Sequence, residues 1–246
     1  MCSTSDSCAR LVICYDCFMP ISVCKSDYFT DRSRAVIQIC VEENGGNRSI
    51  ENFYSPKFLD VFLLTATSLE AFINERIAIA LEICTRRLLL NDPVNLPTID
   101  EDRRHLKIPR RMKRKDLRSK YLRLPQDLWH RTYDENQSPF RDFKILVDIR
   151  NDIVHYTMPF YEQENQAPRW VEQLSNIDIF MPNPVIVAPV SITGENGRVW
   201  IDEICTLKGA KWAHNTSCAL VKQFYEMSEG IIRETMGDYA DYFKEF

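Results

Sequence analysis

The segment SPKFLDVFLLTATSLEAFINERIAIALEICTRRLLLNDP, residues 55–93, decides the fold class of this 246-residue chain. Its apolar side chains recur at spacings of three and four residues, at Phe58, Phe62, Ala66, Leu69, Ile73, Ile77, Ala80, Cys84 and Leu88. This spacing places them on one face of a helix. Ser55 is a favourable N-cap, Pro56 suits the first helical turn, and Asn91-Asp92-Pro93 ends the pattern. A helix of about 50 Å, at about 1.5 Å per residue, predicts the central element of a helical bundle.

Three more helices are expected after this one. A shorter helix is predicted over residues 116–131, and Ser138-Pro139 begins the next, which Pro159 ends. That second helix places Phe140, Phe143, Val147, Arg150 and Val154 on one stripe. The last helix runs from Asp202 to about Ile232, with Ala213, Ser217, Leu220, Phe224, Met227 and Ile231 on one face.

Short β-branched segments suggest some strand as well. Residues 10–19 and 35–41 are of this kind, and a glycine-containing turn follows the second. Residues 180–200 resemble a β-hairpin inserted between helices. We therefore interpret the chain as one mainly α domain, with a helical bundle over residues 55–246 and a small β-containing N-terminal extension over residues 1–54.

Composition excludes several classes of function. The hydrophobic fraction of 45% and the charged fraction of 27% are those of an ordinary globular protein. The seven glycines form no phosphate-binding loop of the G-x-G-x-x-G or G-x-x-x-x-G-K type. No run of about 20 apolar residues could span a bilayer, and the N-terminus lacks the features of a secretory signal. We expect a cytoplasmic protein that does not bind a membrane.

The cysteines and histidines do not predict a metal site. Six of the nine cysteines lie in the first 40 residues, and in the cytoplasm we expect them to be reduced. Cys14 and Cys17 have the spacing of half a zinc site, but no second close pair of ligands follows. No two histidines have the i, i+4 spacing of a helical metal site. Neither a metal nor another cofactor is expected.

A strongly basic run interrupts the helical pattern, inside an excursion over residues 91–131. Residues 103–123 hold eleven Lys or Arg and one acid, a net charge of +10 in a chain of net charge −4. Such a run predicts RNA binding, centred on Arg110, Arg111, Lys113, Arg114 and Lys115. Two alternatives stay open: a solvated loop, or a segment docked on the acidic remainder of its own chain or of a second copy.

The run Arg150-Asn151-Asp152-Ile153-Val154-His155 carries the residues most suited to chemistry. On a helix Asn151 and His155 lie one above the other, and Arg150 lies about 100° to one side. Arg is a permanent forked cation for phosphate oxygens, and His exchanges a proton near neutral pH. RNA cleavage without a metal needs both functions. Alternatively, Arg150 pairs with Asp148 or Asp152, and His155 caps the helix C-terminus.

This run resembles the R-N-x-x-x-H motif of the HEPN superfamily, in which an Arg-Asn pair precedes a His near the end of a bundle helix. The segment Ser68-Leu69-Glu70-Ala71-Phe72-Ile73-Asn74 and the helix containing Lys211-Trp212-Ala213 are also similar to helices of HEPN-related proteins. The resemblance extends over about residues 55–232, and the six-residue motif is its specific part.

The resemblance implies an α-helical bundle that forms a homodimer with two motif helices facing each other. It implies a metal-independent endoribonuclease, often a toxin or defence effector, with an antitoxin or regulatory protein as a further partner. Arg150 would then stabilise the phosphate, Asn151 would orient it, and His155 would act as acid or base. Inactive members imply the alternative, a non-catalytic module for dimerisation or for binding RNA or protein.

Overall fold

The computed structural model describes residues 25–45, 53–90, 111–112, 114–155, 170, 173–174, 204–229, 233, 236 and 244–246. Within these residues the chain is mainly helical, as the sequence predicts. The helices with described bounds are α1 (Lys25–Glu43), α2 (Phe58–Leu90), α4 (Leu117–Trp129), α5 (Phe140–Val154) and α8 (Leu207–Met227).

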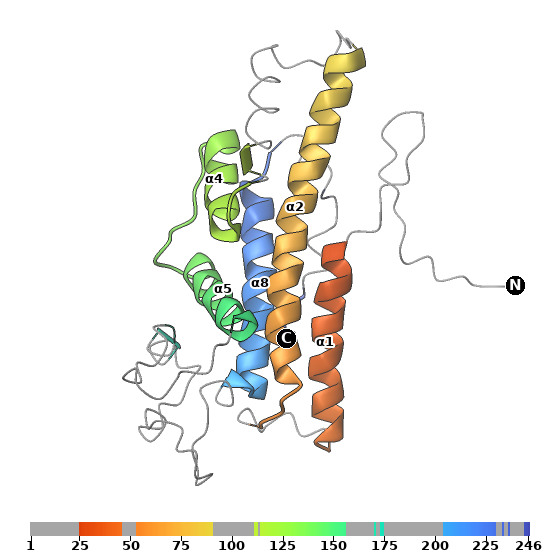
Figure 1. Ribbon diagram of the computed structural model, residues 1–246, viewed down its shortest axis with the longest axis vertical. Helices are drawn as coiled ribbons and strands as arrows, with labels where there is room; N and C mark the ends of the chain where they lie inside the picture. The colour runs from red at the N-terminus through yellow and green to blue at the C-terminus, as the bar shows by residue number, and fades with distance from the viewer. Residues whose placement is uncertain are drawn as a thin grey trace, which may run out of the picture.

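The helices α2 and α8 pack against each other at the centre of the bundle (Figure 1). Helix α1 packs along α2 on one side and also contacts α8. Helices α4 and α5 lie on the other side, where each contacts both α2 and α8. The two central helices therefore have to be apolar on more than one face.

The long helix predicted from residues 55–93 is confirmed as α2, which is 33 residues long. The predicted face is buried wherever its side chains are described, at Phe58, Phe62, Ala66, Leu69, Ile73 and Ile77. Val61, Thr65, Ser68 and Phe72 are buried as well, on the sides that meet α1 and α8. The Ser55 hydroxyl accepts a hydrogen bond from the Lys57 amide at 3.4 Å, and the Ser55 carbonyl accepts one from the Phe58 amide at 3.0 Å. The helix begins at Phe58, two residues after the expected first helical residue Pro56, so Ser55 accepts these bonds from the turn that leads into α2.

The three later helices are shorter than the ranges predicted for them. Helix α4 is capped by Asp116, whose carboxylate accepts the Ser119 amide at 2.9 Å. Helix α5 has Pro139 as its N-cap with no side-chain capping bond, and it ends at Val154 instead of continuing to Pro159. The Thr206 hydroxyl caps α8 by accepting the Gly209 amide at 3.1 Å. The predicted face of α8 is buried from Ala213 to Met227.

The strand predicted for residues 35–41 is wrong, because these residues belong to α1. Their β-branched side chains favour a strand locally, but tertiary packing outweighs so weak a preference. The buried positions follow the helical period when small polar residues are counted with the apolar ones, at Ser26, Thr30, Ser33, Ile37, Cys40 and Val41. The described part of the bundle therefore includes a helix on the N-terminal side of the boundary expected at residue 55.

Hydrogen bonds between small side chains join α1 to α2. The Thr30 and Ser68 hydroxyls are 2.6 Å apart, and Ser68 donates to the Ser26 carbonyl at 2.9 Å. The Ser26 hydroxyl donates to a Glu75 carboxylate oxygen at 2.7 Å. Buried hydroxyls need such partners, and their small size lets the two helices approach closely. A pattern read from apolar residues alone misses this seam.

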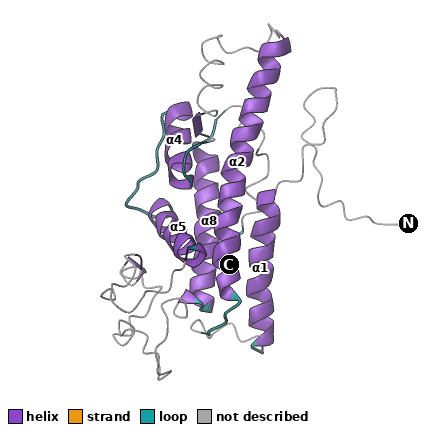
Figure 2. Cartoon of the chain, viewed as in Figure 1, coloured by secondary structure: helices purple, strands orange, loops and turns teal. Residues whose placement is uncertain are grey.

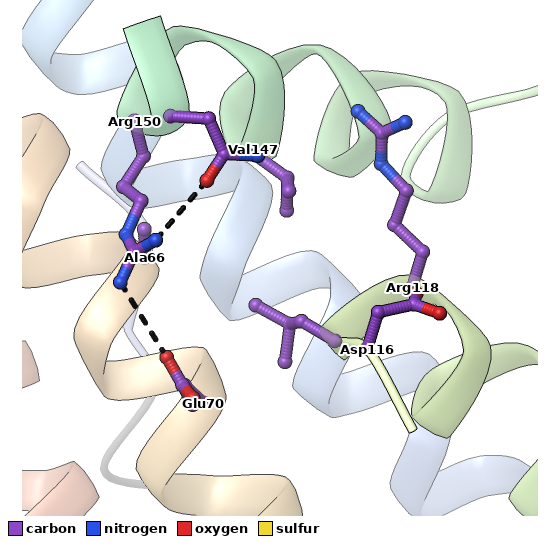
Figure 3. Close-up of a pocket in the computed structure, with 8 residues that line it drawn as sticks. Ala66, Glu70, Asp116, Arg118, Val147 and Arg150 are labelled. Atoms are coloured by element: carbon purple, nitrogen blue, oxygen red, sulfur yellow. Dashed lines mark hydrogen bonds and ion pairs between the residues drawn. The ribbon is translucent and has the colours of Figure 1, made fainter. Parts of the chain in front are cut away.

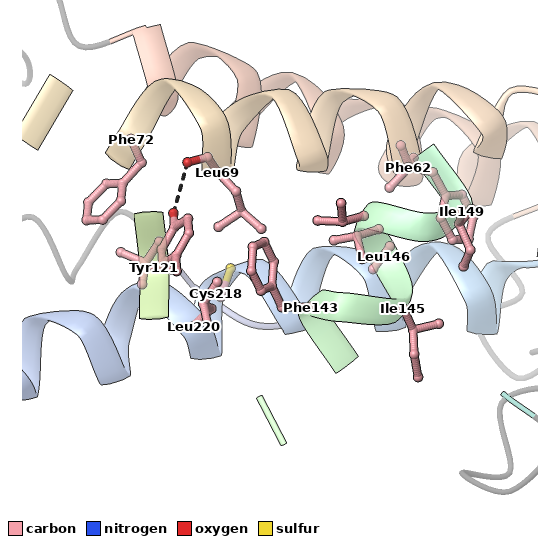
Figure 4. Packing of buried hydrophobic residues seen from close by; sticks show 14 of the residues in the cluster. Phe62, Leu69, Phe72, Tyr121, Phe143, Ile145, Leu146, Ile149, Cys218 and Leu220 are labelled. Atoms are coloured by element: carbon pink, nitrogen blue, oxygen red, sulfur yellow. Dashed lines mark hydrogen bonds between the residues drawn. The ribbon is translucent and has the colours of Figure 1, made fainter. Parts of the chain in front are cut away.

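The core on the α4–α5 side of the bundle is rich in aromatic rings (Figure 4). Tyr121 of α4 is fully buried and donates its hydroxyl hydrogen to the Leu69 carbonyl at 2.9 Å. Its ring centroid is 5.0 Å from that of Phe143 in α5. Phe224 of α8 makes an edge contact with Phe72 of α2 at 5.5 Å. These contacts fix α4 and α5 on the central pair of helices and so define the space between them.

Figure 2 colours the described residues by secondary structure and shows helices joined by loops. An isolated antiparallel bridge between Tyr54 and Thr206 holds the chain before α2 beside the chain before α8. The strand predicted for residues 10–19 and the hairpin predicted for residues 180–200 lie outside the described residues, as does the excursion from residue 91 to residue 110. Among the described helices, none is both long and apolar enough to cross a bilayer.

Candidate functional site

Arg150 and Asn151 lie in the last turn of α5, and both line a cavity of about 390 Å³. The cavity lies between α2, the start of α4 and the end of α5 (Figure 3). The Arg150 side chain is 35% exposed, so a ligand in solvent can reach it. One of its Nη atoms lies 3.8 Å from Glu70 Oε2 of α2, and the other donates to Asn151 Oδ1 at 3.1 Å.

The rest of the cavity combines an apolar surface with charged side chains. Ala66, Leu117 and Val147 supply the apolar part. Glu70, Asp116 and Arg118 supply charge beside Arg150, with Arg118 and Arg150 on opposite sides of the space (Figure 3). Two arginines and two carboxylates make the lining electrically balanced when no ligand is bound. An anion that enters must therefore compete with carboxylates already present.

His155 is not among the residues that line this cavity. It is the C-cap of α5, its side chain is exposed, and its amide donates to the Asn151 carbonyl at 2.8 Å. The structure thus brings two of the three predicted catalytic residues together in the cavity and leaves the third in solvent at the end of the same helix. The helix ends at Val154, one residue before His155. His155 is therefore the C-cap and not the helical residue that the predicted i, i+4 alignment with Asn151 requires.

The ion pairs differ from those that the alternative interpretation of the motif predicts. Arg150 is paired with Glu70, and neither Asp148 nor Asp152 is its partner. Asp148 forms its ion pair with Arg118, and Asp152 accepts a hydrogen bond from Trp170 Nε1 at 2.6 Å. Asp148 and Asp152 therefore fasten other parts of the chain to this helix. They leave Arg150 facing α2.

Part of the basic run lies at the same cavity. Arg111, Arg114 and Lys115 are exposed, while Arg110 and Lys113 lie outside the described residues. The next residues, Asp116 to Arg118, line the cavity at the start of α4. The Ser119 amide and then its hydroxyl hydrogen-bond to the Asp116 carboxylate and lower its pKa, so Asp116 is ionised at neutral pH. Three exposed cations therefore lie shortly before Asp116 in the sequence, and Asp116 lines the same cavity as Arg150.

Arg118 differs from the exposed cations Arg111, Arg114 and Lys115, because its guanidinium contacts α5. It donates to the Lys144 carbonyl at 2.6 Å and forms a close ion pair with Asp148. Both partners are on α5, so Arg118 joins α4 to α5. Lys120 of the same run is buried and donates to Asn74 Oδ1 of α2 at 2.7 Å. For Arg118 and Lys120 the structure agrees with the alternative in which the run docks on its own chain.

The sequence gives no signal for two of the lining residues, Glu70 and Arg118. Glu70 is one polar residue within a long helix, and Arg118 is one cation among eleven in its run. Their importance comes from contacts between helices that lie far apart in the chain. A pattern of local spacing cannot reveal such contacts.

A second group of reactive residue types lies between α1 and α8. His214 Nδ1 is 2.9 Å from the Ser33 hydroxyl oxygen, and its Nε2 is 3.5 Å from Cys218 Sγ and 3.1 Å from the Lys244 carbonyl. Burial lowers the pKa of His214 to about 4 and raises the pKa of Cys218 to about 12. Both groups are neutral at pH 7, so Cys218 is a buried thiol and not a thiolate nucleophile.

In the described part of the chain, no three His, Cys, Asp or Glu side chains are grouped so that they could hold a metal ion. A scan of protein-family models and searches of curated proteins and solved structures find no match to this chain.

Proposed function

We propose that this protein binds RNA at the cavity between α2, α4 and α5 and cleaves it without a metal, in the manner of a HEPN-like endoribonuclease. The observation that carries the proposal is that Arg150 and Asn151 of the motif and residues Asp116 to Arg118 of the basic run border one accessible cavity. These segments are far apart in the chain. Their convergence supplies a phosphate-binding group and an electrostatic path to it.

In the proposed reaction the 2′-oxygen of a ribose attacks the adjacent phosphorus, and the bond from phosphorus to the 5′-oxygen breaks. The products are a 2′,3′-cyclic phosphate and a 5′-hydroxyl. Arg150 stabilises the negative charge of the phosphorane, and Asn151 orients the phosphate. His155 transfers a proton, either from the 2′-hydroxyl or to the 5′-oxygen.

We also propose that the active form is a homodimer. His155 is exposed at the end of α5, and the neighbouring Val154 is an exposed apolar side chain, at 52%. A second copy that covers the end of α5 would bury Val154 and exclude water around His155. Cleavage of cellular RNA would make the protein a toxin or defence effector, held inactive by an antitoxin or another regulatory protein.

One observation favours a non-catalytic alternative, a module that binds RNA or protein without cutting it. Arg150 already has the Glu70 carboxylate as a partner, and His155 does not line the cavity. Such a module would retain the exposed cations of the basic run and the apolar surface of the cavity. It would lack an acid or base beside the phosphate.

The test is incubation of the purified protein with total RNA in the presence of a chelator. We expect cleavage by the wild-type protein and a loss of at least about 100-fold in Arg150→Ala and in His155→Ala, because each removes a group that acts on the reacting phosphate. Arg32→Ala on the exposed face of α1 and His130→Asn at the end of α4 are the matched controls and should cut normally. Asn tolerates the left-handed conformation of His130.

Intact RNA with wild-type protein would reject catalysis and favour the binding module. Equal cleavage by the wild type and both site variants would show that the activity arises elsewhere. A 3′-phosphate without a cyclic intermediate would exclude attack by the 2′-oxygen.

A further inference from the structure

The two arginines that line the cavity, Arg118 and Arg150, are each paired with a carboxylate, and the two pairs differ in how tightly they are held. Arg118 of α4 is fixed by a close ion pair with Asp148 and by a hydrogen bond of 2.6 Å to the Lys144 carbonyl. Arg150 of α5 faces Glu70 of α2 at 3.8 Å, which is beyond hydrogen-bond distance (Figure 3). Burial does not explain the difference, because the two carboxylates are equally exposed, at 46%.

The looser pair is the one that a ligand can open most readily. An ion pair between partly exposed side chains contributes at most about 1 kcal/mol, and the Arg150–Glu70 pair lacks the direct hydrogen bond that would strengthen it. If Arg118 turned toward a ligand, it would break both its ion pair with Asp148 and its hydrogen bond to α5. Arg150 is therefore the exchangeable cation of the cavity, and Arg118 is the structural one.

We propose that the Glu70 carboxylate occupies the place beside Arg150 that a phosphate of the ligand takes, so that phosphate binding displaces it. Glu70 is then a specificity-determining residue that tunes the site by competition. Weakly held anions fail to displace the carboxylate, whereas a polyanion that also contacts Arg114 and Lys115 succeeds. This inference rests on the RNA binding proposed above, but it does not depend on cleavage.

Displacement of Glu70 predicts the direction in which its substitution changes the affinity for RNA. Replacing Glu70 by Gln removes the competing charge and keeps the size of the side chain, so the affinity for a phosphate chain should rise. An exposed ion pair of at most about 1 kcal/mol corresponds to a gain of up to about fivefold. A structural role for Glu70 predicts the reverse, because its removal would leave Arg150 without an anchor.

The experiment measures the binding of a fluorescently labelled 2′-O-methyl RNA oligonucleotide, in which the attacking hydroxyl is blocked. Wild type, Glu70→Gln, Arg150→Ala and the double variant are compared by anisotropy at constant salt. Glu226→Gln is the matched control, since it is the same substitution at an exposed position of α8, a helix that does not line the cavity. Thermal unfolding verifies that each variant is folded.

We expect Glu70→Gln to bind up to about fivefold more tightly, Arg150→Ala to bind less tightly, and the double variant to show no gain over Arg150→Ala. Unchanged or weaker binding by Glu70→Gln overturns the inference, as does a gain that persists without Arg150 or that also appears in Glu226→Gln. An Arg150-dependent gain in a protein that does not cut RNA supports this inference and rejects cleavage. Cleavage by the wild type with no gain in Glu70→Gln supports the proposed function and rejects this inference.

Discussion

Two histidines of this chain differ in exposure, since His155 is exposed and His214 is buried, and this difference determines what each side chain can do. His155 is exposed at the end of α5. His214 is fully buried, with Ser33 at one ring nitrogen and the Lys244 carbonyl at the other. Desolvation is the main cause of its low pKa, about 4, and the Arg34 charge lowers the pKa further. His214 is therefore a structural residue.

The buried His214 should make the stability of the fold depend on pH. Because its folded pKa, about 4, is below the ordinary value of 6.5, the unfolded chain binds more protons between these values. The free energy of unfolding should therefore decrease as the pH falls from about 6.5 to about 4. Between about pH 7 and about pH 5 the contribution of His214 to this decrease is about 2 kcal/mol.

Denaturant unfolding at both pH values measures this contribution. We expect His214→Gln, which cannot titrate, to lose about 2 kcal/mol less on acidification than the wild type does. His155→Gln is the control, since it is the same substitution at an exposed histidine. An identical decrease in all three proteins would mean that other groups carry the acid sensitivity.

At the scale of elements, α1 illustrates how composition can mislead. Val36, Ile37, Ile39 and Val41 have the side chains of a strand, and a strand would place Ile37 and Ile39 on the same face. In the helix they point to different sides, so Ile37 is 1% exposed and Ile39 is 43% exposed. The helix forms because it buries Ile37 and Cys40 against α2 and α8 while its small hydroxyls bond across the seam.

This difference gives a direct test of α1. We expect Ile37→Ala to lower the free energy of unfolding by about 2–5 kcal/mol, since it leaves a cavity in the core. The matched change Ile39→Ala should cost no more than about 0.5 kcal/mol at its exposed position. Denaturant unfolding of both variants measures the two effects, and equal effects would contradict the helical assignment.

At the scale of the whole molecule, charge is distributed unevenly around the cavity. The run over residues 103–123 has a net charge of +10, so the remainder of the chain carries −14. Arg118 pairs its charge with α5, whereas Arg111, Arg114 and Lys115 are exposed and shortly precede in sequence the residues of the run that line the cavity. Exposed cations of this kind bind phosphates by releasing counterions, which makes binding sensitive to salt.

The salt dependence of RNA binding should therefore identify these cations. We expect the double variant Arg114→Gln/Lys115→Gln to weaken binding and to reduce the slope of log affinity against log salt by up to about 1.4, or about 0.7 for each phosphate that is no longer neutralised. The control is Arg32→Gln/Lys222→Gln, which removes one exposed Arg and one exposed Lys from α1 and α8. Equal slopes in the two double variants would mean that Arg114 and Lys115 contribute no more to RNA binding than cations elsewhere on the surface.

The amino-acid sequence is sufficient to predict the mainly helical class, the long α2 with its buried face, and the approximate positions of α4, α5 and α8. These features follow from local periodicity, since each helix satisfies its own backbone and needs only one apolar stripe to pack. It also singled out Arg150 and Asn151 as candidates for phosphate binding, which stays a prediction.

The helical conformation of residues 35–41 is apparent from the tertiary structure alone, because packing against α2 outweighs the local preference of β-branched side chains. The tertiary structure alone placed Glu70 beside Arg150, fastened Arg118 to α5 and left His155 outside the cavity. Those outcomes depend on contacts between residues far apart in the chain, and their energies are set by the distance and exposure of the paired charges.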